Sequence, residues 1–131
     1  HGTLHRPELF DYIQSPQDAD PSLDVMPLRV CFVGHTHVPV TLLRLKDDPA
    51  QRTAYTTDGD IVVADASRAL VNVGSVGQPR DEDPRTAYAV YDSELEHVWI
   101  RRLEYDVEQE AHRIRKAGLP PMLADRLFLG V

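Results

Sequence analysis

Short runs of apolar and β-branched residues, separated by turn-forming residues, fill the middle of this chain and restrict its fold more than any other feature. Each run has the length and composition of a strand and is too short for a typical helix. Asp58-Gly59 favours a tight hairpin, because both central residues of a type I′ turn need positive φ. The predicted strands cover residues 28–33, 40–45, 51–57, 61–64, 69–73, 86–91 and 95–103. We therefore expect short, mostly antiparallel strands.

The segment before the first predicted strand carries weaker signals. Leu9, Phe10 and Ile13 recur at helical spacing, which predicts a short helix over residues 7–13. Residues 15–27 are rich in Pro, Asp and Ser and contain few apolar residues. This composition predicts a surface loop that leads into the first strand.

Helical signals return after the last predicted strand. Asp106 and Gln109 form a capping-box-like start, and Gly118 provides a stop. A further amphipathic turn or two is expected over residues 122–129, where its apolar side would cover a sheet face. The whole pattern predicts an α/β or α+β half-sandwich, with mostly antiparallel strands followed by two C-terminal helices.

Composition excludes several classes of protein. Fourteen Lys and Arg against 21 Asp and Glu give a net charge of −7, which argues against generic nucleic-acid binding. No apolar run reaches the roughly 20 residues of a membrane span, and no leader-like segment is present. The single cysteine excludes an internal disulfide. We expect a cytoplasmic protein that does not bind membranes.

Two histidines, His35 and His37, follow the apolar run 30–33 and are two positions apart. In an extended backbone, residues i and i+2 point to the same face, so both rings would reach one pocket. Neutral imidazole is a common ligand for Zn, Mn, Fe and Ni. The spacing alone leaves two interpretations open: metal ligation, or a pair of histidines that hydrogen-bond to the backbone at a strand end.

Three motifs stand out, Gly34-His35-Thr36-His37, residues 72–80 and His1-Gly2, and together they resemble signatures of the calcineurin-like metallophosphoesterase superfamily. Gly34-His35-Thr36-His37 resembles the last signature, Gly-His-x-His, and residues 72–80 (Asn-Val-Gly-Ser-Val-Gly-Gln-Pro-Arg) resemble the Asn-x-Gly-Ser stretch that follows it. His1-Gly2 resembles the isolated His-Gly signature that precedes both. The order of the three makes the resemblance specific. It is closest to small bacterial and archaeal phosphoesterases, including phosphodiesterases and diadenosine-tetraphosphatase-like proteins.

The resemblance implies a fold, a cofactor and a reaction. Residues 1–131 would form the C-terminal half of a four-layer αββα sandwich that holds two divalent metal ions, with Mn, Fe or Zn expected. His1 and His35 would share one ion, and His37 would bind its neighbour. In such a binuclear centre, a metal-bridging hydroxide attacks phosphorus while the ions neutralise the phosphate oxygens.

The resemblance covers the whole chain but only about half of the family's domain. The family's opening motifs Asp-x-His and Gly-Asn-His-Asp do not occur here, and their place in the family lies upstream of His1. The expected partners are therefore the missing N-terminal half and a phosphorylated small molecule or nucleotide. We expect the full-length protein to hydrolyse a phosphomonoester, phosphodiester or nucleotide polyphosphate, and this fragment alone to be inactive.

Five further residues are candidates for the pocket. Asn72, Gly74 and Ser75 end a predicted strand beside the presumed metal centre, where small residues allow close approach of the backbone. They would shape the pocket or contact the substrate. Arg80 and Arg85 would reach a phosphate or, as is common for such mixed-charge clusters, form solvated ion pairs.

Two alternatives to the enzyme remain at this stage. One is a metallophosphoesterase-like scaffold that keeps the fold but binds other proteins instead of catalysing a reaction. The other is an unrelated small domain with a mononuclear histidine site. Intact ligand motifs upstream would favour the enzyme, and their loss would favour the scaffold.

Overall fold

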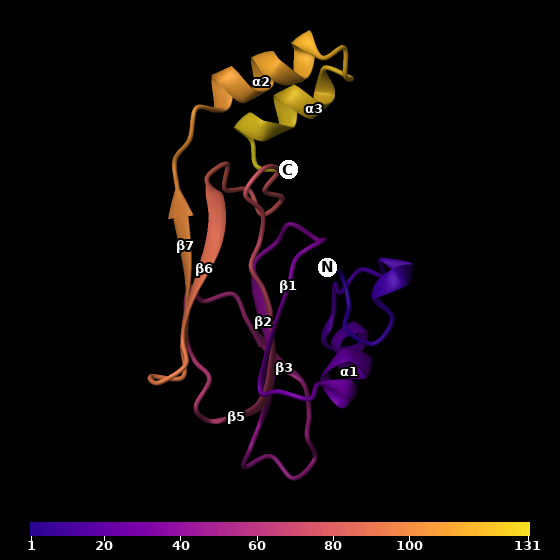
Figure 1. Ribbon diagram of the computed structural model, residues 1–131, viewed down its shortest axis with the longest axis vertical. Helices are drawn as coiled ribbons and strands as arrows, with labels where there is room; N and C mark the ends of the chain where they lie inside the picture. The colour runs from indigo at the N-terminus through magenta and orange to yellow at the C-terminus, as the bar shows by residue number, and fades with distance from the viewer.

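Two β-sheets pack face to face, one helix covers the outer face of the first sheet, and two helices lie beyond one end of the strands (Figure 1). The computed structural model describes residues 1–131. The helices and strands in chain order are η1 (Pro7–Leu9), α1 (Pro16–Val25), β1 (Val30–Val33), β2 (Val40–Leu45), β3 (Ala54–Thr56), β4 (Asp60–Val62), β5 (Ala66–Asn72), β6 (Thr86–Asp92), β7 (His97–Leu103), α2 (Val107–Lys116), α3 (Met122–Asp125) and η2 (Arg126–Phe128).

The two sheets differ in how their strands pair. The first has the order β1-β5-β2-β3, in which β1 runs parallel to β5 while β2 is antiparallel to both of its neighbours. The second has the order β4-β7-β6 and is antiparallel throughout. This confirms the predicted α+β half-sandwich. Each predicted strand region overlaps an observed strand, although the ends differ by a few residues.

The hairpin predicted at Asp58-Gly59 is wrong. These residues connect β3 to β4, but β3 pairs with β2 and β4 pairs with β7 in the other sheet. The Gly59 carbonyl accepts a hydrogen bond of 2.8 Å from the backbone N–H of Ile100 on β7. A turn dipeptide between two strand-like runs indicates a change of direction, but it does not identify the partner of the second strand.

Residues 16–25 form helix α1, where the sequence predicts a loop. Ser15 caps this helix, because its Oγ accepts a hydrogen bond from the backbone N–H of Asp18, and Pro16 occupies the first turn. Ala19 and Leu23 are fully buried against the first sheet. Two well-placed apolar residues and a good cap are therefore enough for a helix despite the polar composition.

The helix predicted over residues 7–13 is reduced to the single 3₁₀ turn η1. Phe10 follows this turn in a left-handed conformation, with φ of 54°, and a left-handed residue ends a helix. Residues 11–15 then run as an irregular segment along the first sheet. This turn at Phe10 directs its carbonyl oxygen toward His35.

The core has two parts, one on each face of the first sheet. The outer part lies between α1 and this sheet, and the inner part lies between the two sheets. Members of the outer part are Ile13, Ala19, Leu23, Met26, Val33, Leu42 and Leu70, and members of the inner part are Ile61, Val63, Ala66, Ala69, Val71 and Val98. The central strand β5 contributes to both parts.

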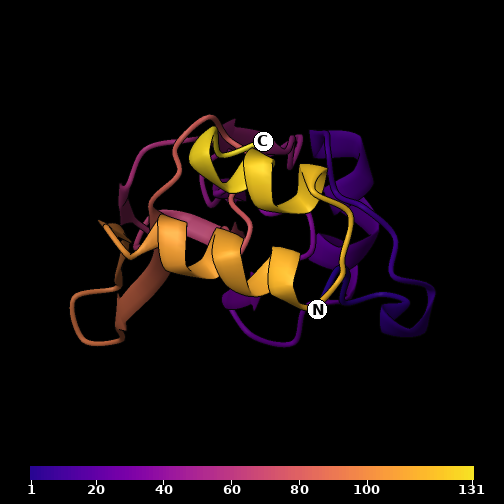
Figure 2. The same cartoon turned by 90° about the horizontal axis from the view of Figure 1, so that it is seen from above.

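The two C-terminal helices lie side by side, as Figure 2 shows from above. Asp106 caps α2 as predicted, with its Oδ1 accepting from the backbone N–H of Gln109 at 2.9 Å. The short helix α3 packs against α2 and not against a sheet face, contrary to the prediction. The following turn η2 contacts both helices, and its Leu127 is buried. None of the helices has the length and apolar character needed to cross a bilayer.

Candidate metal centre

His35 and His37 lie in the histidine loop, residues 34–39, between β1 and β2. Both have left-handed backbones, with φ of 71° and 63°. The predicted extended arrangement, with two rings on one face of a strand end, is therefore wrong. Left-handed backbone in non-glycine residues costs of order 1–3 kcal/mol each and is frequent at functional sites. Surrounding contacts must hold this loop in place.

Asn72, at the end of β5, holds the histidine loop. Its Nδ2 donates hydrogen bonds to the Gly34 carbonyl at 2.7 Å and to Thr36 Oγ1 at 2.8 Å, and its Oδ1 accepts from the backbone N–H of Gly74 at 3.0 Å. The side chain is buried, with 2% of Asn72 exposed. Asn72 is therefore a positioning residue whose side-chain amide hydrogen-bonds only to groups of the protein itself.

The ring of His37 has a fixed orientation. Its Nδ1 lies 2.7 Å from the Gln78 carbonyl oxygen, which can only accept, so Nδ1 donates and Nε2 carries the lone pair in the neutral ring. Ser75 supports this contact, because its Oγ accepts from the backbone N–H of Gln78 at 2.9 Å. Burial lowers the pKa of His37, which favours the neutral ring that metals require.

The ring of His35 is oriented in the same way by a different segment. Its Nε2 donates to the Phe10 carbonyl at 2.8 Å, which leaves Nδ1 free. The ring of Tyr12 lies against that of His35, with 4.2 Å between ring centroids. The ring of His1 lies on the His35 ring edge, with 5.3 Å between centroids and an interplanar angle of 72°. Residues 1 and 35 are thus brought together.

Two glycines permit this close arrangement. A Cβ at Gly2 would lie 2.8 Å from the Asp11 carbonyl oxygen and 3.2 Å from Cδ2 of His35. Gly74 has φ of 80°, and a Cβ there would lie 2.7 Å from Cγ of Pro39 and 2.9 Å from Cβ of Ala87. The lack of a side chain at both positions is therefore a requirement of the site.

The two candidate arginines have different surroundings. The backbone N–H of Arg80 donates to the His37 carbonyl at 3.2 Å, and its side-chain Nε is buried with no hydrogen-bond partner. Arg85 forms an ion pair with Asp83 at 2.7 Å and is half exposed. Arg80 thus lies beside the histidine loop, whereas Arg85 is part of a solvated ion pair.

The available donors fit part of a metal site. His1, His35 and His37 offer imidazole nitrogens, and the second nitrogen of His35 and of His37 is already held by a carbonyl, as is common for metal-binding histidines. No group of three or more His, Cys, Asp or Glu residues is arranged to hold a metal ion by itself. The three histidines therefore do not form a complete metal site within this chain.

Sequence reasoning did not identify three residues that position the histidines. Phe10 and Gln78 act through backbone carbonyls, which no side-chain pattern encodes. Tyr12 contacts His35 across a separation of 23 residues along the chain, and only the tertiary fold reveals this contact. Of the three, only Gln78 lies within a motif that the sequence analysis identified, the 72–80 stretch.

The chain is similar in sequence and structure to longer proteins. No protein-family model matches it. An uncharacterized protein of Methanocaldococcus jannaschii is 32% identical over 130 residues, which are 99% of this chain and 50% of that protein. A crystal structure of a metallophosphoesterase from Sphaerobacter thermophilus superposes with a TM-score of 0.87 and 36% identity, over 100% of this chain and 54% of that one. The chain thus spans about half the length of each.

Proposed function

We propose that the full-length protein is a metal-dependent phosphoester hydrolase of the calcineurin-like metallophosphoesterase superfamily, and that this segment contributes histidine ligands to its metal centre. The similarity of the whole chain to the metallophosphoesterase from Sphaerobacter thermophilus supports the proposal. One observation carries the proposal. The strained histidine loop presents two imidazoles, each with one nitrogen hydrogen-bonded to a backbone carbonyl and the other free. That arrangement suits metal ligation and has no evident value for stability alone.

We assign His1 and His35 to one ion and His37 to its neighbour. The contact between the His1 and His35 rings supports a shared ion, and the separate anchoring of His37 on Gln78 supports a second position. When bound, a pair of Mn, Fe or Zn ions would activate water and neutralise the oxygens of the phosphate. The contribution of this segment is to hold the imidazoles of His35 and His37 in a fixed orientation.

The remaining ligands, under this proposal, come from the half of the domain that the chain does not cover. An open apolar edge supports this view: Phe32 on β1 and Tyr91 on β6 are both about two-fifths exposed, with 5.8 Å between their ring centroids. β1 and β6 are the edge strands of the two sheets. Further strands added at this edge would bury these rings and continue both sheets.

Arg80 is the candidate group for the substrate's phosphate. Its positive side chain lies beside the histidine loop and has an unused donor in Nε, and guanidinium groups bind phosphate oxygens well. Asn72 and Ser75 act indirectly: Asn72 holds the histidine loop, and Ser75 holds the Gln78 backbone whose carbonyl orients His37. The proposed substrates are phosphomonoesters, phosphodiesters or nucleotide polyphosphates.

The test is hydrolysis of p-nitrophenyl phosphate and bis-p-nitrophenyl phosphate by the full-length protein with added Mn²⁺. We expect turnover that is lost in His37→Ala and retained in His112→Ala, a matched variant at an exposed position on α2. Equal turnover in both variants would refute the role of His37. A wild-type protein that binds no metal and hydrolyses neither ester would instead favour a non-catalytic scaffold.

A further inference from the structure

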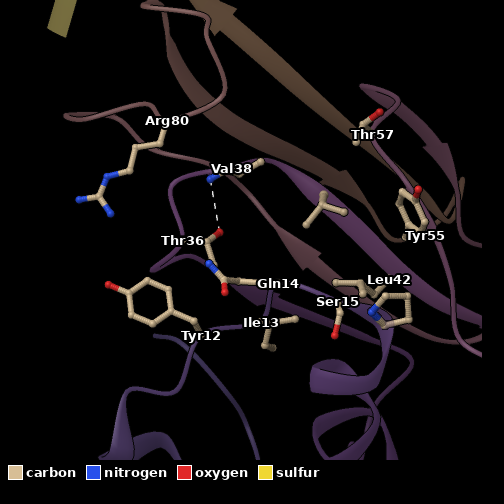
Figure 3. A pocket seen from close by; sticks show the side chains of 12 residues that line it. Tyr12, Ile13, Gln14, Ser15, Thr36, Val38, Leu42, Tyr55, Thr57 and Arg80 are labelled. Atoms are coloured by element: carbon tan, nitrogen blue, oxygen red, sulfur yellow. Dashed lines mark hydrogen bonds between the residues drawn. The ribbon is translucent and has the colours of Figure 1, made fainter. Parts of the chain in front are cut away.

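A cavity of about 490 Å³ opens beside the histidine loop, between residues 12–16 and the strands β2 and β3 (Figure 3). Half of its lining residues are apolar, among them Val38 and the buried Leu42. Sites for small organic molecules have this size and character, with a few polar groups that fix orientation. The cavity therefore has room for more than a phosphate group.

The cavity borders the histidine loop. Thr36, between the two histidines of the loop, lines it directly. Tyr12 lines it as well and lies with its ring against His35. A ligand whose phosphate is held at the histidines would thus extend its organic part into this cavity.

The charged residue of the lining and the exposed ring of Tyr55 lie at opposite ends of the cavity (Figure 3). Arg80 is its one charged residue. Figure 3 shows Arg80 and Tyr12 at one end and Tyr55 at the other. Tyr55, on β3, is 65% exposed, so its ring has a face available for a ligand. One end therefore suits an anion, and the other suits a flat apolar group.

One end of the cavity lies far from the edge at which we place the remaining half of the domain. Tyr55 belongs to β3, which is at the opposite edge of the first sheet from β1. The open apolar edge, at which we place the remaining half of the domain, is formed by β1 and β6. The end of the cavity at Tyr55 therefore lies away from that edge.

We propose that this cavity binds a planar aromatic group, such as a nucleobase or an aryl ring, carried by the phosphoester substrate. Tyr55 contacts the ring, the apolar strand residues form the floor, and Arg80 faces the phosphate. This inference rests on the proposed function and restricts it: phosphoesters of aromatic alcohols or of nucleosides are preferred over those of small aliphatic alcohols.

Phosphonates test the cavity without catalysis, because their carbon–phosphorus bond is not a substrate for phosphoester hydrolysis. Isothermal titration of the metal-loaded full-length protein with phenylphosphonate and methylphosphonate measures the preference directly. We expect phenylphosphonate to bind about tenfold more tightly, and Tyr55→Ala to reduce this preference about fivefold, as aromatic contacts of this kind contribute. Tyr55→Phe keeps the ring and should keep the preference.

The possible outcomes test the cavity proposal and the proposed function independently. Equal affinity for the two phosphonates, or a phenyl preference that Tyr55→Ala leaves unchanged, overturns the cavity proposal even if the protein hydrolyses esters. A preference that depends on Tyr55, in a protein that hydrolyses neither nitrophenyl ester, supports the cavity and contradicts the proposed function.

Discussion

Two irregular segments near the candidate site are held by opposite kinds of interaction. The histidine loop is held by uncharged partners: the Asn72 amide and the carbonyls of Phe10 and Gln78. The acidic loop, residues 81–85, is held by ion pairs, in which Asp83 binds Arg85 and Asp81 binds Arg102. The two segments therefore differ in the charge of the groups that hold them in place.

The comparison predicts different sensitivities. Hydrogen bonds between neutral groups depend little on salt or on pH, whereas ion pairs at a surface weaken with salt and fail when the carboxylate is protonated. The histidine loop should therefore respond mainly to changes in shape and hydrogen bonding. The acidic loop should respond mainly to pH and ionic strength.

The largest effect is expected for Gly74→Ala, next to the histidine loop. An alanine at this position would have to keep φ of 80°, and its Cβ would lie 2.7 Å from Pro39 Cγ. Strain and overpacking together should lower the free energy of unfolding by about 4 kcal/mol. Denaturant unfolding measures this loss. Gly77→Ala is the matched control, because no atom lies within 4 Å of its Cβ position; similar losses in the two variants would contradict the account.

Asn72→Ala should have the next largest effect. It removes three hydrogen bonds from a buried position, which predicts a loss of about 3 kcal/mol in the free energy of unfolding. The loss should be the same at about 0.1 M and about 1 M salt, because no partner is charged. A loss that shrinks markedly in high salt would mean that the histidine loop is held electrostatically after all.

Asp83→Asn should have the smallest effect. The hydrogen bond from Arg85, helped by the charge of Arg102 and opposed by burial, lowers the pKa of Asp83 to about 2. Because this is below the value of about 3.9 in the unfolded chain, ionised Asp83 stabilises the protein above about pH 4, and the contribution disappears as pH falls through about 2.

Partial exposure of this pair limits the cost of Asp83→Asn to about 1 kcal/mol near neutral pH. Thermal unfolding of the wild type and the variant between neutral and acidic pH measures the difference. Asp47→Asn, at an exposed carboxylate that forms no ion pair, is the matched control. A difference between Asp83→Asn and wild type that persists below about pH 2 would show that the pair is not its cause.

The sequence predicted the strands and the α2 cap well, because both depend on local signals. Apolar runs mark β2, β5, β6 and β7, and Asp106 caps α2 through its own side chain. It missed α1, whose polar composition conceals two buried residues, Ala19 and Leu23. It also assigned a hairpin at Asp58-Gly59, because strand partners are decided by contacts between the two sheets and not by a turn dipeptide.

The motifs supplied the residues of the candidate site, but the spacing did not predict the backbone geometry of the histidine loop. The motifs identified His35, His37 and the 72–80 stretch, yet spacing implied an extended backbone where both histidines are left-handed. The cause is Asn72, whose bonds to Gly34 and Thr36 bend the loop from a distant part of the chain. Hydrogen bonds between residues so far apart along the chain cannot be predicted from local sequence patterns.

Metal content of the full-length protein, measured by elemental analysis after purification without chelator, tests the central claim most directly. If the histidine loop supplies ligands to two ions, the wild type should carry two divalent metals per chain, and His37→Ala should carry fewer, while His112→Ala matches the wild type. Equal metal content in all three proteins, or its absence from the wild type, would contradict the account.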